Sequence, residues 1–219
     1  MKICFFSDTH LLHNQVTLPE CDIACFTGDM CGSGTVYQAI DFLQWYDDQK
    51  GPRHKCYLAG NHDKTYDPQR SSLSEPFKKD DIIKMYPNLH YLENSSIEIE
   101  GVKIWGSPIT PNFFERYWAF NKPRGEEINK IWELIPDDTD IVLTHGPVHG
   151  ILDLVPRGEH TGCEDLKAKI LKIQPKVHAC GHIHHSYGIL EKYYPTTFVN
   201  SSLVNEQYEF VNQPIVLDL

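Results

Sequence analysis

The chain has 219 residues, of which 41% are hydrophobic and 23% charged, a composition that is typical of folded proteins and unlike that of disordered ones. Its length suits one α/β domain with a large core, so we expect a single domain over residues 1–219. The formal net charge of −10 disfavours binding to long nucleic acid, which normally meets a basic face. A small anionic substrate remains acceptable, because bound cations neutralise acidic groups locally.

No apolar run approaches the ~20 residues that a membrane-spanning helix needs. The segment 1–8 turns acidic too early for a secretory signal, and most of the cysteines lie in apolar runs. We therefore expect a soluble, cytoplasmic protein without a membrane partner, in which the cysteines are reduced and buried. The sequence makes no prediction of the oligomeric state.

Strand and helix signals alternate along the chain. β-branched and aromatic runs between turn residues predict strands at 2–7, 22–27, 55–59, 97–100, 103–105, 140–144, 176–180, 197–199 and 214–219. Gly101 separates two of these runs and indicates a hairpin, hence some antiparallel pairing. Helical periodicity predicts helices at 36–49, 126–134 and 164–173. Residues 66–79 contain several Pro and Ser and predict an exposed loop, and the segment 66–94 carries no chemical signal.

Side chains that can bind metal ions follow five of the predicted strands. They occur in the segments Asp8-Thr9-His10, Gly28-Asp29, Gly60-Asn61-His62-Asp63, Thr144-His145-Gly146 and Gly181-His182-Ile183-His184. Residues i and i+2 of extended backbone project to the same side, so the first and last segments each offer two ligands from one strand end. Oxygen and imidazole donors without thiolate suit a hydrolytic pair of divalent cations at the carboxyl ends of strands. Any one of these residues could instead cap a turn, but for the ordered set we favour a metal site.

The ordered series D-x-H, GD, GNHD, H and GHxH resembles the calcineurin-like metallophosphoesterase superfamily, and all five motifs are intact. The resemblance implies an α/β fold, a four-layer αββα sandwich of two mixed β-sheets with the dimetal site at the carboxyl ends of the strands. It also implies two divalent metal ions, which we expect to be Mn²⁺, with Fe, Zn or Mg as alternatives. By this resemblance one ion is held by Asp8, His10, Asp29 and His184, and the other by Asp29, Asn61, His145 and His182.

His62 and Asp63 receive catalytic roles from the same resemblance. His62 would protonate the leaving oxygen or stabilise the charged transition state, and Asp63 would orient it. An imidazole group, with an ordinary pKa of ~6.5, suits a general acid near neutral pH. The alternative is that the two residues cap the N-terminus of a helix.

Connecting segments carry a closer resemblance. The metallophosphoesterase-domain branch, which includes the brain-enriched cyclic-nucleotide phosphodiesterases of animals, is similar to this chain at His13, Gly106-Ser107-Pro108, Trp118-Ala119-Phe120-Asn121, Gly150-Ile151-Leu152-Asp153 and His160-Thr161-Gly162-Cys163. Some animal members have Gly in place of His182, which this chain keeps. The resemblance implies a phosphodiesterase for small substrates such as 2′,3′- or 3′,5′-cyclic nucleotides, with in-line attack by a hydroxide held on the metals. Alternatives are a phosphomonoesterase or protein phosphatase and, less favoured, a nuclease or a non-catalytic scaffold.

Candidate substrate contacts are His13, Arg116, Trp118 and His160. The two histidines belong to motifs of the branch, although a lone histidine in a loop is often only solvated. Trp118, like Phe113 and Phe120, offers an aromatic face to a nucleobase, with packing in the core or a lid as the alternative. Arg116 and Arg124 can bind phosphate through paired hydrogen bonds, and are equally explained as solvated side chains. Asn200 either lines the rim of the site or closes a turn.

Overall fold

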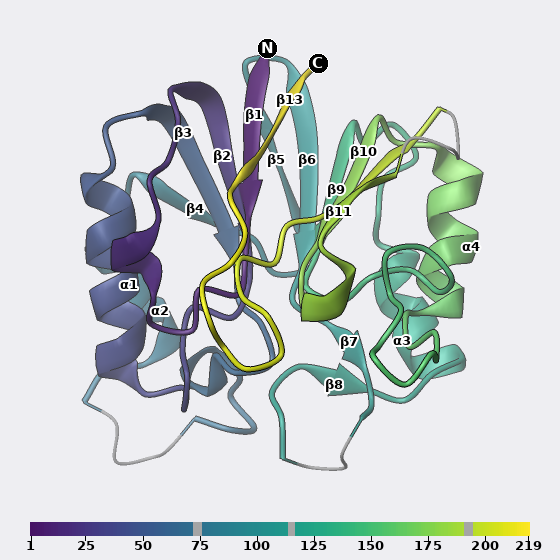
Figure 1. Cartoon of the computed structure of the whole chain (residues 1–219), viewed down its shortest axis with the longest axis horizontal. Coiled ribbons are helices and arrows are strands. Elements are labelled where there is room, and N and C mark those ends of the chain that lie inside the picture. Colours follow the sequence, from purple (N-terminus) through teal and green to yellow (C-terminus); the bar gives the residue numbers. More distant parts are fainter. Residues whose placement is uncertain (72–75, 114–116, 191–194) are drawn as a thin grey trace.

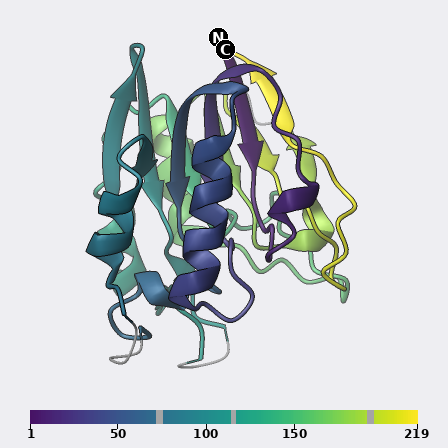
Figure 2. The same ribbon diagram turned by 90° about the vertical axis from the view of Figure 1, so that its left-hand side faces the viewer.

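Two β-sheets pack face to face in the computed structural model, and helices cover the outer face of each sheet (Figure 1), which confirms the predicted four-layer αββα sandwich. The structure describes residues 1–71, 76–113, 117–190 and 195–219. The first sheet is covered by α1 (Val36–Asp48) and α2 (Lys79–Met85), which Figure 2 shows from their own side. The second sheet is covered by α3 (Glu126–Trp132) and α4 (Glu164–Ile173).

The first sheet has the strand order β13-β1-β2-β3-β4. Its strands are β1 (Lys2–Phe6), β2 (Cys21–Thr27), β3 (Pro52–Leu58), β4 (Leu89–Tyr91) and β13 (Ile215–Asp218). The first four are parallel, and β13 is antiparallel to β1. Both faces are apolar because both are covered: Ile3 and Phe5 pack between the sheets, while Cys4 and Phe6 pack on the helix side, where Phe6 contacts Tyr46 of α1.

The second sheet has the order β11-β12-β10-β9-β6-β5. Its strands are β5 (Ser95–Ile99), β6 (Val102–Ser107), β9 (Ile141–Thr144), β10 (Val177–Cys180), β11 (Gly188–Leu190) and β12 (Thr197–Asn200). The central strands are parallel, and the edge strands β5 and β11 are antiparallel. Gly101, with a φ of 82°, makes the predicted β5–β6 hairpin turn. A separate pair, β7 (Thr110–Pro111) and β8 (Asn121–Lys122), follows β6.

All predicted strands and helices are present, but the prediction of an exposed loop at 66–79 is wrong at its start. Tyr66 is fully buried, and its ring packs against Tyr57 and Tyr91. Residues 72–75 of that loop lie outside the described residues. The sequence also missed α2 and the short strands β4, β7, β8 and β11, which are seven residues or fewer and carry too few side chains to show a periodicity.

The two sheets are joined where their parallel strands end. Directly after β1, the Ser7 N–H donates to the Ser201 carbonyl (3.1 Å), and the Ser7 carbonyl accepts from the N–H of Leu203 (3.1 Å). The strand ends that precede the metal-binding motifs therefore face one common edge of the sandwich. Within the described ranges, none of the helices combines the length and the apolar character required to traverse a lipid bilayer.

Candidate metal centre

The backbone turns sharply at the ends of the strands that carry the predicted ligands. Four of these residues have positive φ angles, namely Asp8 (52°), His10 (41°), Asp29 (62°) and His182 (68°). This region is unfavourable for residues with a Cβ, and such strain collects at functional sites. The turns direct the side chains over the edge of the sheets rather than onto their faces.

The first group of donor atoms lies at the end of β1. The Nε2 atom of His184 is 3.5 Å from Asp8 Oδ1 and 3.4 Å from His10 Nε2. His10 Nε2 in turn is 3.8 Å from Asp29 Oδ2. Two donors bound to one ion at ~2.1 Å and at right angles lie roughly 3 Å apart, so these side chains need only small shifts to share a cation.

The second group surrounds His145. Its Nε2 atom is 2.9 Å from Asn61 Oδ1 and 3.3 Å from Asp29 Oδ2. A ligand atom of His182 lies within 4.8 Å of those of Asp29 and His145. Because the same oxygen of Asp29 faces both groups, the carboxylate stands where a bridging ligand would. The structure thus brings together all seven side chains that the sequence proposed as ligands.

Backbone carbonyls orient three of the histidine ligands. The Nδ1 atoms of His10, His145 and His184 lie 3.1, 2.9 and 3.0 Å from the carbonyl oxygens of Cys31, Thr27 and Asn205. Each Nδ1 therefore carries the proton of the neutral ring, and Nε2 is the nitrogen that can present a lone pair to the centre. This is the tautomer that metal binding through Nε2 requires, so the residues present fit a pair of divalent cations.

Glycines make room for the two carboxylates. A Cβ atom at Gly181 would overlap the Asp8 carboxylate and the Ser7 hydroxyl, and a Cβ atom at Gly60 would overlap the Asp29 carboxylate. The glycines of the GD, GN and GH motifs are therefore needed for packing as well as for turning the chain.

The protonation states also suit metal binding. Burial raises the pKa of Asp8, but its hydrogen bond with His184 and the charges of the histidines bring it down to about 2. Burial lowers the pKa of His10 to about 4 and that of His182 to about 3. Burial also lowers the pKa of His145, but the neighbouring Asp29 more than offsets this and the net value is about 9. Burial also lowers the pKa of His184, but its hydrogen bond with Asp8 more than offsets this and the pKa is raised. The centre therefore offers anionic carboxylates, and His145 must release a proton to bind a cation near neutral pH.

His62 stands at the side of the centre. Its ring centroid is 4.6 Å from that of His10 and 4.3 Å from that of Trp118. The Nδ1 atom lies 2.7 Å from the carbonyl of Gly32, which fixes the ring and leaves Nε2 without a partner among the described residues. The orienting contact predicted for Asp63 is thus made by a backbone carbonyl.

Asp63 instead holds two of the ligand segments together through hydrogen bonds. Its carboxylate accepts the N–H groups of Gly60 (2.7 Å), Asp29 (2.9 Å) and Cys31 (2.9 Å), so it ties the second ligand segment to the third. It precedes a 3₁₀ turn at Lys64–Tyr66 but makes no side-chain cap to it, contrary to the capping alternative. The catalytic roles of His62 and Asp63 stay predictions.

The predicted substrate contacts have different placements. Trp118 lines a cavity of about 280 Å³ together with Asp29, Asn61 and His62. His160 lines a neighbouring cavity, with Nδ1 2.6 Å from the buried Asp153 carboxylate. Arg116 lies outside the described residues.

His13 is packed away from the ligands. It is fully buried against Phe42 and Trp45 of α1, and its Nε2 is 3.2 Å from Asp41. This position does not support a substrate contact. Phe120 is also buried, whereas Phe113 lines both cavities.

Several residues near the centre were missed or left undecided by the sequence. Tyr208 lies edge-on to His10 with ring centroids 4.7 Å apart, and Asn205 supplies the carbonyl that orients His184. Asn200 lies beneath the GHxH turn, where its Nδ2 donates to the Ile183 carbonyl (3.0 Å). They follow the last motif, and no spacing signal marks them.

Comparison with known proteins agrees with this geometry. The sequence model of the family described as calcineurin-like phosphoesterase matches residues 1–186. The human Metallophosphoesterase domain-containing protein 1 is 34% identical over 230 residues, covering 97% of this chain and 69% of that protein. UPF0046 protein K07C11.7 of Caenorhabditis elegans is 31% identical over 99% of this chain and 74% of its own length. The solved structure of phosphopantetheinyl hydrolase from Mycobacterium tuberculosis shares the fold at 12% identity, with a TM-score of 0.67 over 94% of this chain and 90% of the other. The chain belongs to the calcineurin-like phosphoesterase family.

Proposed function

We propose that this protein is a two-metal phosphodiesterase that acts on small substrates, 2′,3′- or 3′,5′-cyclic nucleotides first among them. Membership of the family supports a phosphoric ester hydrolase. The observation that carries the proposal is the convergence of two donor groups on one oxygen of Asp29. Mn²⁺ is the expected metal, since mixed oxygen and imidazole donors without thiolate suit it. The seven cysteines are free and buried, in keeping with a cytoplasmic location.

The side chains around the centre have distinct tasks in hydrolysis. When bound, two divalent cations neutralise the phosphoryl oxygens and lower the pKa of water. His62 shares the cavity with Asp29 and Asn61, and its fixed ring directs Nε2 away from the Gly32 carbonyl, so it can give a proton to the leaving oxygen. Trp118 packs against that ring, with the two rings tilted by 37° and their centroids 4.3 Å apart.

A diester is favoured over a monoester because a second cavity opens beside the first. The cavity of about 430 Å³ shares the walls His182 and Ile183 with the metal cavity. A monoester has one ester bond to an organic group, whereas a diester has two, and in a cyclic nucleotide both belong to one nucleoside, which can extend from the metal cavity into the second cavity. A phosphomonoesterase would bind the same metals, and relative turnover separates the two activities.

The proposal is tested with metal-stripped protein. Mn²⁺, Mg²⁺, Zn²⁺ or Fe²⁺ is added back, and hydrolysis is measured across cyclic nucleotides, bis-p-nitrophenyl phosphate and monoesters. We expect activity only with metal, and higher kcat/KM for diesters. The absence of metal-dependent hydrolysis of every ester would refute the proposal.

The role of His62 is tested by leaving-group dependence. His62→Ala should retain the metals but lose more activity on diesters with poor leaving groups than on those with good ones. His54→Ala removes an exposed histidine paired with Glu100 and serves as the control. Equal losses on both kinds of diester would argue against proton donation by His62.

A further inference from the structure

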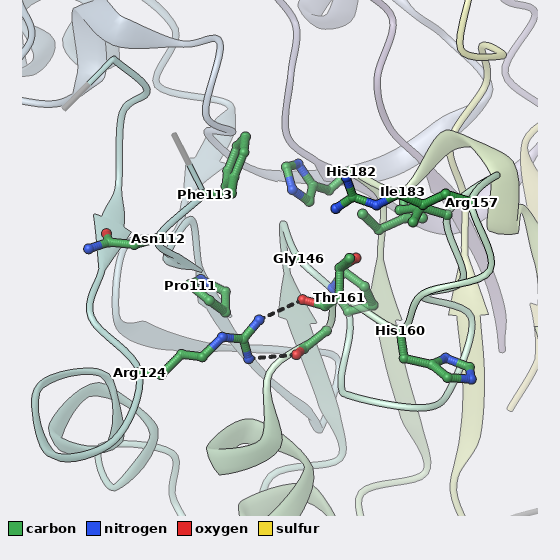
Figure 3. Close-up of a pocket in the computed structure, with 13 residues that line it drawn as sticks. Pro111, Asn112, Phe113, Arg124, Gly146, Arg157, His160, Thr161, His182 and Ile183 are labelled. Atoms are coloured by element: carbon green, nitrogen blue, oxygen red, sulfur yellow. Dashed lines mark hydrogen bonds between the residues drawn. The ribbon is translucent and has the colours of Figure 1, made fainter. Parts of the chain in front are cut away.

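A second cavity continues from the metal cavity along the His182 side. The two cavities share four wall residues, Phe113, Val155, His182 and Ile183, so a ligand can extend from one into the other. Figure 3 shows the second cavity, with Phe113 and His182 on one side of it and Arg124 on the other. Its volume of about 430 Å³ lies in the ~300–1,000 Å³ range of small-ligand sites.

Two arginines line this cavity, and the protein pairs one of them more fully than the other. Arg124 donates to the carbonyls of Thr161 and Gly162, each at 2.8 Å, and forms an ion pair with Glu164 (Figure 3). Its role is to hold the loop at the start of α4.

Arg157 is available to a ligand. Its Nε atom pairs with Glu159 at 2.8 Å, and within the described ranges its two Nη atoms have no hydrogen-bond partner. In Figure 3 the guanidinium group extends along the cavity wall toward His182. A cation with two unpaired Nη atoms beside the proposed phosphoryl site matches the geometry of phosphate recognition by arginine.

We propose that the second cavity binds the ester group that stays on phosphorus, and that Arg157 binds a non-bridging oxygen of the same phosphate. The inference rests on the proposed phosphodiesterase function. The substrates it selects are phosphodiesters whose retained group is bulky and organic, such as a nucleoside, because Phe113, Val155 and Ile183 give the cavity apolar walls.

The position of His62 decides which of the two ester groups leaves and which is retained in the second cavity. His62 lines the metal cavity but not the second one, so the bond to the leaving oxygen points toward His62. In the reaction, the oxygen of water bonds to phosphorus and loses one proton to solvent, the bond from phosphorus to the leaving oxygen breaks, and that oxygen takes up a proton from His62, which regains one from solvent. The retained ester bond is untouched, and its organic group remains in the second cavity.

A matched pair of diesters with one leaving group tests this assignment. Thymidine 5′-(p-nitrophenyl phosphate) and methyl p-nitrophenyl phosphate both release p-nitrophenol and differ only in the retained group. We expect wild-type protein to have a kcat/KM about tenfold or more higher for the thymidine ester. Arg157→Ala should raise KM for both diesters about 10- to 100-fold, the loss expected for a charged hydrogen bond, and Arg157→Lys should restore part of it.

Filling the cavity separates its role from that of the arginine. Thr161 lines the second cavity only, and Thr161→Phe should lower the kcat/KM for the thymidine ester to that for the methyl ester. Lys130→Ala removes an exposed cation on α3 and is the control for charge alone. If Thr161→Phe fails to fold, the Arg157 variants decide, because that side chain is largely exposed.

The outcomes are distinct. Equal kcat/KM of wild-type protein for the two diesters, or unchanged KM in Arg157→Ala, overturns the inference while leaving the phosphodiesterase function intact. Hydrolysis of cyclic nucleotides but of neither p-nitrophenyl diester also overturns the inference, whereas failure of wild-type protein to hydrolyse any ester with any metal overturns the proposed function itself.

Discussion

Replacement of Asn200 by alanine should weaken metal binding, because this side chain supports the GHxH turn that carries two of the proposed ligands. The side chain is fully buried, and its Nδ2 donates to the carbonyls of Ile183 (3.0 Å) and Leu152 (3.2 Å) while its Oδ1 accepts from the N–H of Ser202 (3.2 Å). Each such bond contributes ~1 kcal/mol, and a buried group left unpaired costs more, so the variant should lose about 2–4 kcal/mol of unfolding free energy. Because Ile183 lies between the two histidine ligands of the GHxH turn, loss of this support should also reduce metal affinity about 10- to 100-fold.

Denaturant unfolding gives the stability, and calorimetric titration of the metal-stripped protein with Mn²⁺ gives the affinities. Asn212→Ala is the matched control, since it removes one hydrogen bond from a side-chain amide to the Ser202 carbonyl (3.0 Å) and makes no change at the GHxH turn. It should cost about 1 kcal/mol and leave metal binding unchanged. Unaltered Mn²⁺ affinity in a folded Asn200→Ala protein would refute the supporting role.

Three further predictions concern the ligands themselves. Asp29→Asn should lower the affinity of both metal sites about tenfold or more, because one carboxylate oxygen serves both, and a titration in which one site is unaffected would contradict the bridge. Gly181→Ala should abolish binding at the Asp8 site by steric overlap, whereas Gly32→Ala, whose Cβ meets only a leucine methyl at 3.6 Å, should bind normally in the same titration. The raised pKa of His145, about 9, means that a cation must displace a proton below that pH. The affinity of the second site for the cation should therefore rise roughly tenfold per pH unit up to about pH 9 and then level off. An affinity that does not change from pH 6 to 9 would show that metal binding displaces no proton from His145.

The ligand set was predictable because its signals are local. Each motif follows an apolar strand, and parallel strands bring their carboxyl ends to one edge, so Asp8 and His184 meet although they are 176 positions apart in the chain. The four-layer sandwich was implied by the resemblance of these motifs to the metallophosphoesterase superfamily, and the apolar residues on both faces of β1, Ile3 and Phe5 on one and Cys4 and Phe6 on the other, agree with it.

Other assignments needed the tertiary structure. The sequence suggests that His13 is a loop histidine near Asp8. The structure shows that it is enclosed by Phe42 and Trp45, because α1 packs over it. The contacts of Asp63 with backbone N–H groups of two other segments leave no trace in sequence spacing. Tyr208 is brought to the centre by a C-terminal loop that has neither periodicity nor motif.

Each of the two proposed metal sites would draw ligands from both halves of the sandwich. The first would take Asp8, His10 and Asp29 from the N-terminal sheet and His184 from the other, and the second would take Asp29 and Asn61 from the N-terminal sheet and His145 and His182 from the other. Bound cations would thus act as cross-links between the two layers, at the edge where Ser7 already connects them. Free metal at 100 times its Kd would add ~2.7 kcal/mol per site to the free energy of unfolding. Removal of the metals by a chelator should therefore weaken the contact between the two sheets and make the protein more susceptible to proteolysis.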